Sequence, residues 1–199
     1  MLKAETFFDL KGHKLKSLFD NTEYVWDGLQ QLKSYLKNKL NPNVAEIRHS
    51  KSLIGQDIVL YAGQTLRSGF LIDPVKAIVT MDGKILKGAS IIYAGASLMD
   101  DAIYIGQGTV IEPGACIKGP VIIGDNTEVR QGAYIRGNVL IGDHCVVGHA
   151  TEIKASVMLG ESKAGHFAYI GDSILGKVNL GAGTKLANLK ITASKIVVT

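Results

Sequence analysis

The sequence predicts a mainly β protein, a parallel β-helix of six-residue repeats that follows a short helical segment. An aliphatic residue stands at every sixth position from Ile105 to Leu159. A small or β-branched residue follows these aliphatic residues four positions later, from Thr109 to Val157. Glycine is frequent, with 23 residues, and proline is rare, with 4. A six-residue period of this length is typical of parallel β-helices, and glycines suit their corners.

Each repeat is expected to form one straight side and one corner of a three-sided coil. The aliphatic and small residues then point into the coil, and successive coils stack about 4.8 Å apart through strand-type hydrogen bonds. Three repeats make a turn of 18 residues, so residues 18 positions apart in the sequence are expected to lie directly above one another.

The composition describes a globular chain without a strong charge preference. The 199 residues are 46% hydrophobic and carry a net charge of +4, which is too small to predict a nucleic-acid or membrane partner. The first residues lack the apolar core of a signal peptide, and no apolar stretch approaches the length of a spanning helix. Two cysteines, Cys116 and Cys145, are too few for a disulfide framework or a zinc site. We therefore expect reduced thiols in a cytoplasmic protein.

Residues 1–50 are predicted to form an N-terminal helical segment, and residues 51–199 the β-helix domain. The stretch NTEYVWDGLQQLKSYLKNKL, residues 21–40, has helical spacing of its apolar residues, and Asn41-Pro42 ends it. A helix packed on the domain, or linking from it, is favoured over a helix on a membrane surface because charged helix faces are usually solvated. The apolar face consists of Val25, Leu29, Leu32, Leu36 and Leu40.

Residues 54–104 are predicted to form irregular early coils with insertions. Val79, Ile85 and Ile91 keep a six-residue step there, in a different phase from the later series. Regular coils are expected from about residue 105 onward.

Three cations share one position of the coil. Lys118, Arg136 and Lys154 stand 18 residues apart, each directly after an inward aliphatic residue, so they are expected to form a vertical row on neighbouring coils. Like charges on adjacent strands repel one another. Such a row is therefore either a solvated basic edge or a site for an anion, and phosphate is an anion that suits clusters of Arg and Lys.

The six-residue series breaks in the segment SKAGHFAYIGDS, residues 162–173. The next position after Leu159 is Gly165, and the series resumes at Ile174 after a spacing that is not a multiple of six. We therefore expect an insertion that leaves the coil as a loop from Gly160 to Tyr169.

His166 lies in this expected loop, shortly after Lys154. Loops on a rigid scaffold are common places for catalytic groups, and histidine accepts a proton near neutral pH. His166 is thus a candidate general base, with a purely structural histidine as the alternative.

Two other histidines, His144 and His149, lie in the segment IGDHCVVGHATEIK. The motif VVGH is similar to one in the γ-class carbonic anhydrases, which bind zinc between subunits of a β-helix. Those enzymes have a second histidine five residues later, where this chain has Lys154. A cation opposes a metal ion at that position, so no metal site is predicted.

The hexad series resembles the left-handed β-helix of the hexapeptide-repeat transferases, which are typically trimers. The segments KAGHFAYIGDS and NLGAGTKLAN closely resemble the acetyltransferase half of the bifunctional glucosamine-1-phosphate acetyltransferase/N-acetylglucosamine-1-phosphate uridyltransferases. Related sugar-phosphate nucleotidyltransferases have the same C-terminal module. The resemblance covers roughly residues 105–190, and the histidine segment with GAGT is specific to that branch.

This resemblance implies acetyl-CoA as co-substrate, an amino-sugar phosphate as substrate and a homotrimer. It implies that His166 deprotonates the sugar amine and that Arg136 and Lys154 hold the phosphate, in agreement with the row of cations. The other implied roles are sugar binding for Tyr169 and Asn179, and a place near the acetyl-CoA thioester for Ala182 and Asn188.

Two departures from the family concern the ends of the chain. The first residues contain no Gly-rich nucleotide loop of that family, so uridylyl transfer is not expected of this chain. The chain stops at Thr199, where the family continues with coils that hold much of acetyl-CoA. Either the chain is truncated or its acetyl-CoA site is incomplete, and Lys195 is only an approximate counterpart of the family's basic residue there.

The favoured function is therefore acetyl-CoA-dependent N-acetyl transfer to an amino-sugar phosphate such as glucosamine 1-phosphate, by direct attack of the amine without an acyl-enzyme. The alternative is a trimeric module that binds a sugar phosphate or nucleotide sugar without turnover. The missing coils favour the module, and the set of His166, Arg136, Lys154 and Asn188 favours the enzyme. An acyltransferase for longer acyl donors has no support beyond the fold, and the sequence does not choose the sugar.

Overall fold

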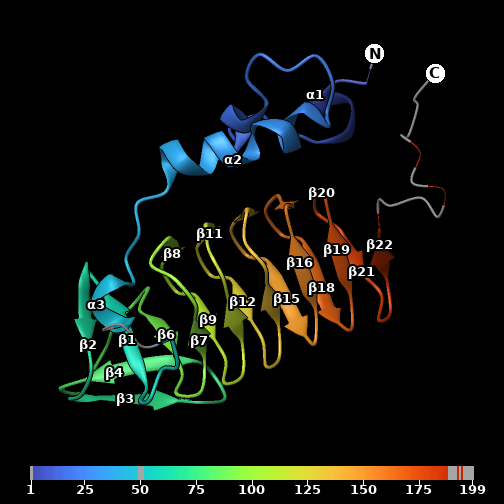
Figure 1. Ribbon diagram of the computed structural model, residues 1–199. Coiled ribbons are helices and arrows are strands. Elements are labelled where there is room, and N and C mark those ends of the chain that lie inside the picture. Colours follow the sequence, from blue (N-terminus) through green and yellow to red (C-terminus); the bar gives the residue numbers. More distant parts are fainter. Residues whose placement is uncertain (1, 49–51, 188–191, 193, 195–199) are drawn as a thin grey trace.

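The computed structural model of the chain (Figure 1) describes residues 2–48, 52–187, 192 and 194. It confirms the predicted left-handed β-helix, in which three parallel sheets form the sides of a prism. We name these sheets side one, side two and side three. The helices that precede the prism are α1 (Ala4–Phe7), the 3-10 helix η1 (Lys16–Phe19), α2 (Asp27–Lys39) and α3 (Ala45–Arg48).

The chain visits the three sides in turn, so that every third strand belongs to the same sheet. Side one consists of β6 (Ser90–Ile92), β9 (Val110–Ile111), β12 (Glu128–Val129), β15 (Val146–His149), β18 (Lys163–His166) and β21 (Asn179–Leu180), extended at its start by the antiparallel strands β1 (Ile58–Tyr61) and β2 (Gln64–Leu66). Side two consists of β7 (Ser97–Leu98), β10 (Cys116–Ile117), β13 (Tyr134–Ile135), β16 (Glu152–Lys154), β19 (Tyr169–Gly171) and β22 (Lys185–Leu186). Side three consists of β8 (Ile103–Ile105), β11 (Val121–Ile123), β14 (Val139–Ile141), β17 (Val157–Met158) and β20 (Ile174–Leu175).

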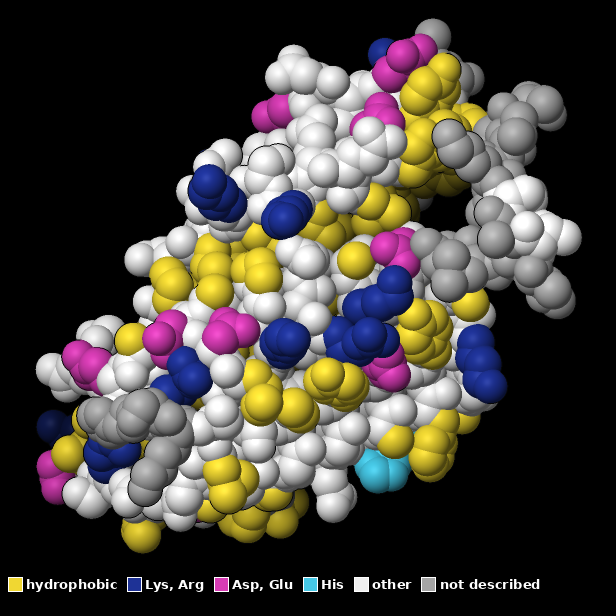
Figure 2. All heavy atoms as spheres, viewed as in Figure 1, with side chains coloured by type: hydrophobic (Ala, Val, Ile, Leu, Met, Phe, Trp, Pro, Cys, Tyr) yellow, Lys and Arg dark blue, Asp and Glu magenta, His cyan; other side chains and the backbone are white. Residues whose placement is uncertain are grey.

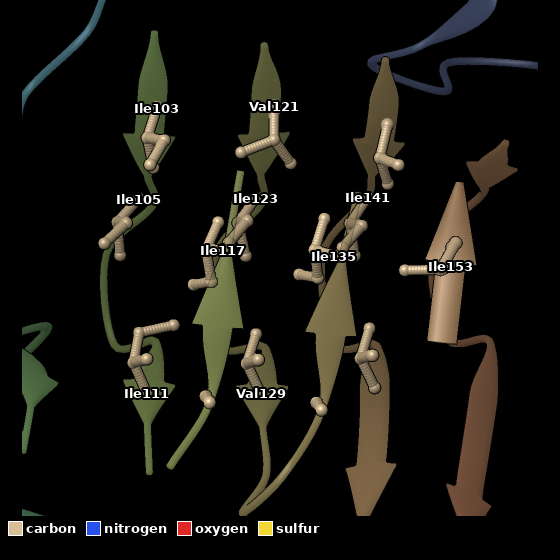
Figure 3. Close-up of a cluster of buried hydrophobic side chains, with 14 of the residues drawn as sticks. Ile103, Ile105, Ile111, Ile117, Val121, Ile123, Val129, Ile135, Ile141 and Ile153 are labelled. Atoms are coloured by element: carbon tan, nitrogen blue, oxygen red, sulfur yellow. The ribbon is translucent and has the colours of Figure 1, made fainter. Parts of the chain in front are cut away.

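One aliphatic residue of each repeat points into the prism, and these residues stack from coil to coil (Figure 3). In the regular coils the stacked partners are 18 residues apart: Ile105 faces Ile123, and Ile123 faces Ile141. These side chains are almost completely buried, so each coil contributes apolar area to one continuous core. The hexad series therefore determines which residues form the interior.

The small-residue column of the hexads also has a structural role at the inward corners. The Thr109 hydroxyl donates to the Gly124 carbonyl at 2.7 Å and accepts from the Thr127 amide at 3.1 Å. Thr127 repeats this pattern one coil later, where its hydroxyl accepts from the Cys145 amide at 3.1 Å. Short polar side chains thus satisfy buried backbone groups that larger residues would displace.

The loop that was expected at the histidine segment is wrong. β18 continues side one as a regular strand and pairs in parallel with β15, with Val147 facing Ala164 and His149 facing His166. These partners are 17 residues apart instead of 18, so the coil is one residue shorter than a regular coil. The spacing changed because a corner lost a residue, and no residues were inserted.

The shortening moves the inward series by one residue. Met158 takes the interior place predicted for Leu159, and Leu175 takes the place predicted for Ile174. Leu159 and Ile174 lie instead on the outer surface of side three, against the N-terminal segment. Ala164 supplies the inward residue between them, so the series continues without a break.

The six-step predicted for Val79, Ile85 and Ile91 does not belong to the inward series. The chain forms a separate antiparallel sheet there, from β3 (Phe70–Asp73), β4 (Ile78–Met81) and β5 (Lys84–Ile85). Ile91 packs with Val79 in a small cluster outside the prism, whereas its neighbour Ile92 points into the interior. The hairpins interrupt the coils, which confirms the irregular start predicted for this region.

The N-terminal segment packs across the outer surface of side three (Figure 1), as the apolar helix face predicted. α2 ends at Lys39, directly before the Asn-Pro pair that was expected to end it. Leu32 and Leu36 are buried and join Leu140 and Val157 of side three in a second core cluster. No helix within the described residues is long and apolar enough to cross a membrane.

Lys14 ties this segment to two neighbouring coils. Its ammonium lies 3.0 Å from Asp125 and 2.6 Å from Asp143. The hydrogen bonds to Asp143 and Asp125 raise the pKa of Lys14 above its ordinary value. Burial raises the pKa of Asp143, but the hydrogen bonds from Lys14 and from the Asp125 amide outweigh this effect and leave the pKa lowered. All three groups therefore stay charged at neutral pH.

Gly148 and Gly165 test the described register, because they are partners on adjacent coils of side one. A Cβ on Gly148 would overlap the backbone of Gly165, whereas nothing lies within 4 Å of a Cβ on Gly165. We expect Gly148→Ala to lower the free energy of unfolding by about 3 kcal/mol, the upper range for overpacking. Gly165→Ala is expected to change it by less than about 1 kcal/mol. Urea unfolding measures both, and equal stability of the two variants would contradict this register.

Candidate functional site

The predicted row of cations lies on the outer surface of side two. The Lys118 amide donates to the Ile135 carbonyl at 2.8 Å, directly before Arg136. The Arg136 amide donates likewise to the Ile153 carbonyl at 2.8 Å, directly before Lys154. The three cations therefore occupy successive coils in one line, which we name the cation row. Figure 2 shows Lys and Arg side chains gathered on one face, with Asp and Glu beside them.

Two members of the cation row are paired with carboxylates. Arg136 Nη1 lies 2.6 Å from Glu152 Oε1, and Lys154 Nζ lies 2.7 Å from Asp172 Oδ2. The hydrogen bond to Glu152 raises the pKa of Arg136, and the hydrogen bond to Asp172 raises the pKa of Lys154. Guanidinium has five N–H donors and ammonium has three, so both cations keep donors for a ligand. The arrangement suits an anion that shares these donors with the carboxylates.

Two tyrosines flank the Glu152 carboxylate on the same surface. Tyr134 and Tyr169 are the Cα partners of Glu152 on β13 and β19. The Tyr169 ring lies over Gly171, where a Cβ would be 2.8 Å from the phenol oxygen. Both tyrosines lie close enough to Arg136 to contribute to its raised pKa. Tyr169 therefore joins the cluster formed by the cation row and its carboxylates.

His166 ends β18 at the corner between sides one and two. Its partner on the preceding coil, His149, has Nδ1 at 2.9 Å from the Gln131 carbonyl and meets the Phe167 ring edge-on at a centroid distance of 5.3 Å. The His166 side chain is exposed, and its ring has no hydrogen-bond partner among the described residues. An imidazole in this setting is available to accept a proton from a bound molecule.

Asn179 lies on a different side of the prism from the cation row. It starts β21 on side one, where its Cα partner on the preceding coil is Lys163. There it lines a cavity of about 680 Å³ together with His144, Glu161 and Lys177. A single chain therefore does not bring Asn179 and the cation row to one ligand.

The two residues implied for acetyl-CoA differ in what the structure describes. The strands before and after the corner of Ala182 are both offset by 16 residues from the preceding coil. That common offset puts Ala182 next to His166 at the same corner, one coil later. Asn188 lies outside the described residues, as does Lys195.

The described part of the chain contains no group of three or more His, Cys, Asp or Glu side chains that could hold a metal ion. Lys154, at the position where the carbonic anhydrase motif would need a histidine, is paired with Asp172. The surface thus offers cations, carboxylates and hydroxyl groups to a polar ligand.

Sequence reasoning missed Glu152, Gly171 and Asp172. Glu152 was accessible to it, because strand alternation puts this residue on the same outer surface as Lys154, two positions later. Gly171 and Asp172 were not accessible, because the 18-residue rule would stack Asp172 on Lys154. The shortened coil stacks Gly171 there and moves Asp172 to the corner.

One family model, described as the GMPPB C-terminal domain, matches residues 117–199. A comparison with curated proteins gave no match. The matched part includes His166 and, from the cation row, Lys118, Arg136 and Lys154. The second half of the chain is therefore similar to a C-terminal β-helix module of the sugar-phosphate nucleotidyltransferases, as the segments KAGHFAYIGDS and NLGAGTKLAN predicted.

Proposed function

We propose that the chain is an acetyl-CoA-dependent N-acetyltransferase that acts on an amino-sugar phosphate. The observation that carries this proposal is the shared outer surface of side two, where Arg136, Lys154 and Tyr169 form one cluster and the exposed imidazole of His166 stands at the edge. Paired phosphate donors and a free base on one surface are what transfer to an amino-sugar phosphate requires.

In the proposed reaction Arg136 and Lys154 bind the phosphate, and Tyr169 contacts the sugar ring. His166 accepts a proton from the sugar amine as the nitrogen attacks the thioester carbonyl of acetyl-CoA. A C–N bond forms and the C–S bond breaks, and the CoA thiolate takes up a proton as it leaves. The chain contributes charge, orientation and a base, and no acyl-enzyme forms.

The proposed active form is a homotrimer. Asn179 on side one and the cation cluster on side two cannot reach one ligand within a single chain. A neighbouring copy that packs side one against side two would bring them together. Side three is occupied by the N-terminal segment, which leaves sides one and two for contacts between copies.

The second candidate is a module that binds a sugar phosphate or nucleotide sugar without turnover. Two observations favour it: the match to a C-terminal domain, and carboxylates that already pair with both Arg136 and Lys154. The two candidates differ in whether CoA is released.

The proposal predicts release of free CoA from acetyl-CoA when one of a panel of amino-sugar phosphates, beginning with glucosamine 1-phosphate, is added. His166→Ala is expected to lower this rate by roughly 10² to 10⁴, the typical contribution of a general base, without lowering the melting temperature. His144→Asn is the control, because His144 has φ of 57° and Asn tolerates that conformation. Full activity of His166→Ala would remove its catalytic role, and sugar-phosphate binding without any CoA release would favour the module.

Binding of the phosphate is tested by calorimetry with glucosamine 1-phosphate and with glucosamine. Arg136→Ala is expected to weaken binding of the phosphorylated sugar by about tenfold or more, because charge-assisted hydrogen bonds to phosphate are lost. Lys118→Ala removes the same charge from the same row, one coil earlier, and is expected to leave binding unchanged. Equal affinity of the unmutated protein for the two sugars would exclude a phosphate site.

Assembly is tested by light scattering coupled to gel filtration. At micromolar concentration the chain is expected to give three times its monomer mass of 21.3 kDa. A monomer mass would contradict the trimer and leave Asn179 without a role in the site.

A further inference from the structure

The two residues that follow Ile170 both contact groups of the proposed site. Gly171 is the Cα partner of Lys154, and the Tyr169 ring lies across it. Three ring atoms, including the phenol oxygen, lie between 2.8 and 3.1 Å from the place of a Cβ on Gly171. The Tyr169 ring can therefore lie flat on side two only because residue 171 has no side chain.

Asp172 holds Lys154 by two separate contacts. Its amide donates to the Lys154 carbonyl at 3.2 Å, and its carboxylate lies 2.7 Å from the Lys154 ammonium. Asp172 occupies a corner with φ of 48°, which Asp and Asn tolerate better than most residues. The same corner holds Ala155 one coil earlier and Gly137 two coils earlier, neither of which has a charged side chain. Of these three stacked coils, only the one of Asp172 has an acid at this corner.

We propose that Gly171 and Asp172 are positioning residues for the sugar-phosphate site: Gly171 fixes the Tyr169 ring against the sheet, and Asp172 fixes the Lys154 ammonium beside it. The inference rests on the proposed function in that a phosphate is taken to bind Lys154. Fixed donors bind a ligand more tightly than mobile ones, because less conformational freedom is lost on binding. A long lysine side chain has several rotatable bonds and gains most from such a partner.

A different role for Asp172 would have the opposite effect on binding. If Asp172 only neutralised Lys154, its removal would free a positive charge and strengthen the binding of a phosphate. If Asp172 orients Lys154, its removal weakens that binding. The sign of the change in affinity therefore distinguishes the two roles.

Each residue has a variant that leaves the fold intact. Asp172→Asn removes the charge and keeps a residue that tolerates positive φ. Gly171→Ala requires no unusual backbone angle, and its Cβ meets only the far end of the Tyr169 side chain, which can move away. Asp82→Asn is the matched control, because Asp82 is also an acid at positive φ, with φ of 49°, but lies in the hairpin between β4 and β5.

The test is calorimetric titration of the full chain with glucosamine 1-phosphate and, separately, with glucosamine. Asp172→Asn is expected to weaken binding of the phosphorylated sugar by about tenfold and to leave glucosamine binding unchanged. Gly171→Ala is expected to weaken binding of both sugars, because Tyr169 contacts the ring and not the phosphate. Asp82→Asn is expected to behave as the unmutated protein.

A double-mutant cycle tests whether Asp172 acts through Lys154. Lys154→Ala alone is expected to weaken binding of glucosamine 1-phosphate, and addition of Asp172→Asn to that variant is expected to cause no further loss. Asp172→Asn that binds the phosphorylated sugar as well as, or better than, the unmutated protein would overturn the inference while the proposed function stands. Additive losses in the double variant would also overturn it. Failure of the unmutated protein to bind glucosamine 1-phosphate would reject the proposed function, and the inference with it.

Discussion

Backbone hydrogen bonding between stacked coils is the constraint on which the rest of this molecule depends. Each coil pairs with the next in parallel register, so an inward residue must meet another inward residue. The same register lines up the outward residues in vertical rows. The cation row, the stacked pair of His149 and His166 and the three sides available for packing all follow from this one ladder of hydrogen bonds.

The N-terminal segment determines how the outer surfaces differ. The prism presents three similar sheets, but side three has apolar outward residues such as Leu140 and Val157, and the segment covers them. Side two has charged and aromatic outward residues and is left exposed to ligands. The division of the chain into a covered side and two open sides thus follows from which outward positions are apolar.

Much of this could be predicted from the sequence, for physical reasons that also explain the failures. The six-residue series identified the interior because burial selects aliphatic residues at every sixth position, and strict spacing aligned Arg136 with Lys154. Corners are chosen by backbone conformation and not by burial, so the loss of a residue from a corner has no clear signal. For that reason the histidine segment was interpreted as an insertion, although Ala164 continues the series. The cation row was predictable, but the carboxylates that pair with it depend on coil length.

The shortened coil has a consequence for how such surfaces change. A coil of the regular length would have stacked Asp172 directly on Lys154, in line with the cation row. With one residue fewer, a glycine stands there, a tyrosine ring covers it, and the acid approaches the ammonium from the corner. Deletion of a single residue has therefore re-paired the external side chains while the interior kept its aliphatic series. In a solenoid of this kind, the length of a coil is a heritable variable of its own, through which a lineage can acquire a new surface without a new core.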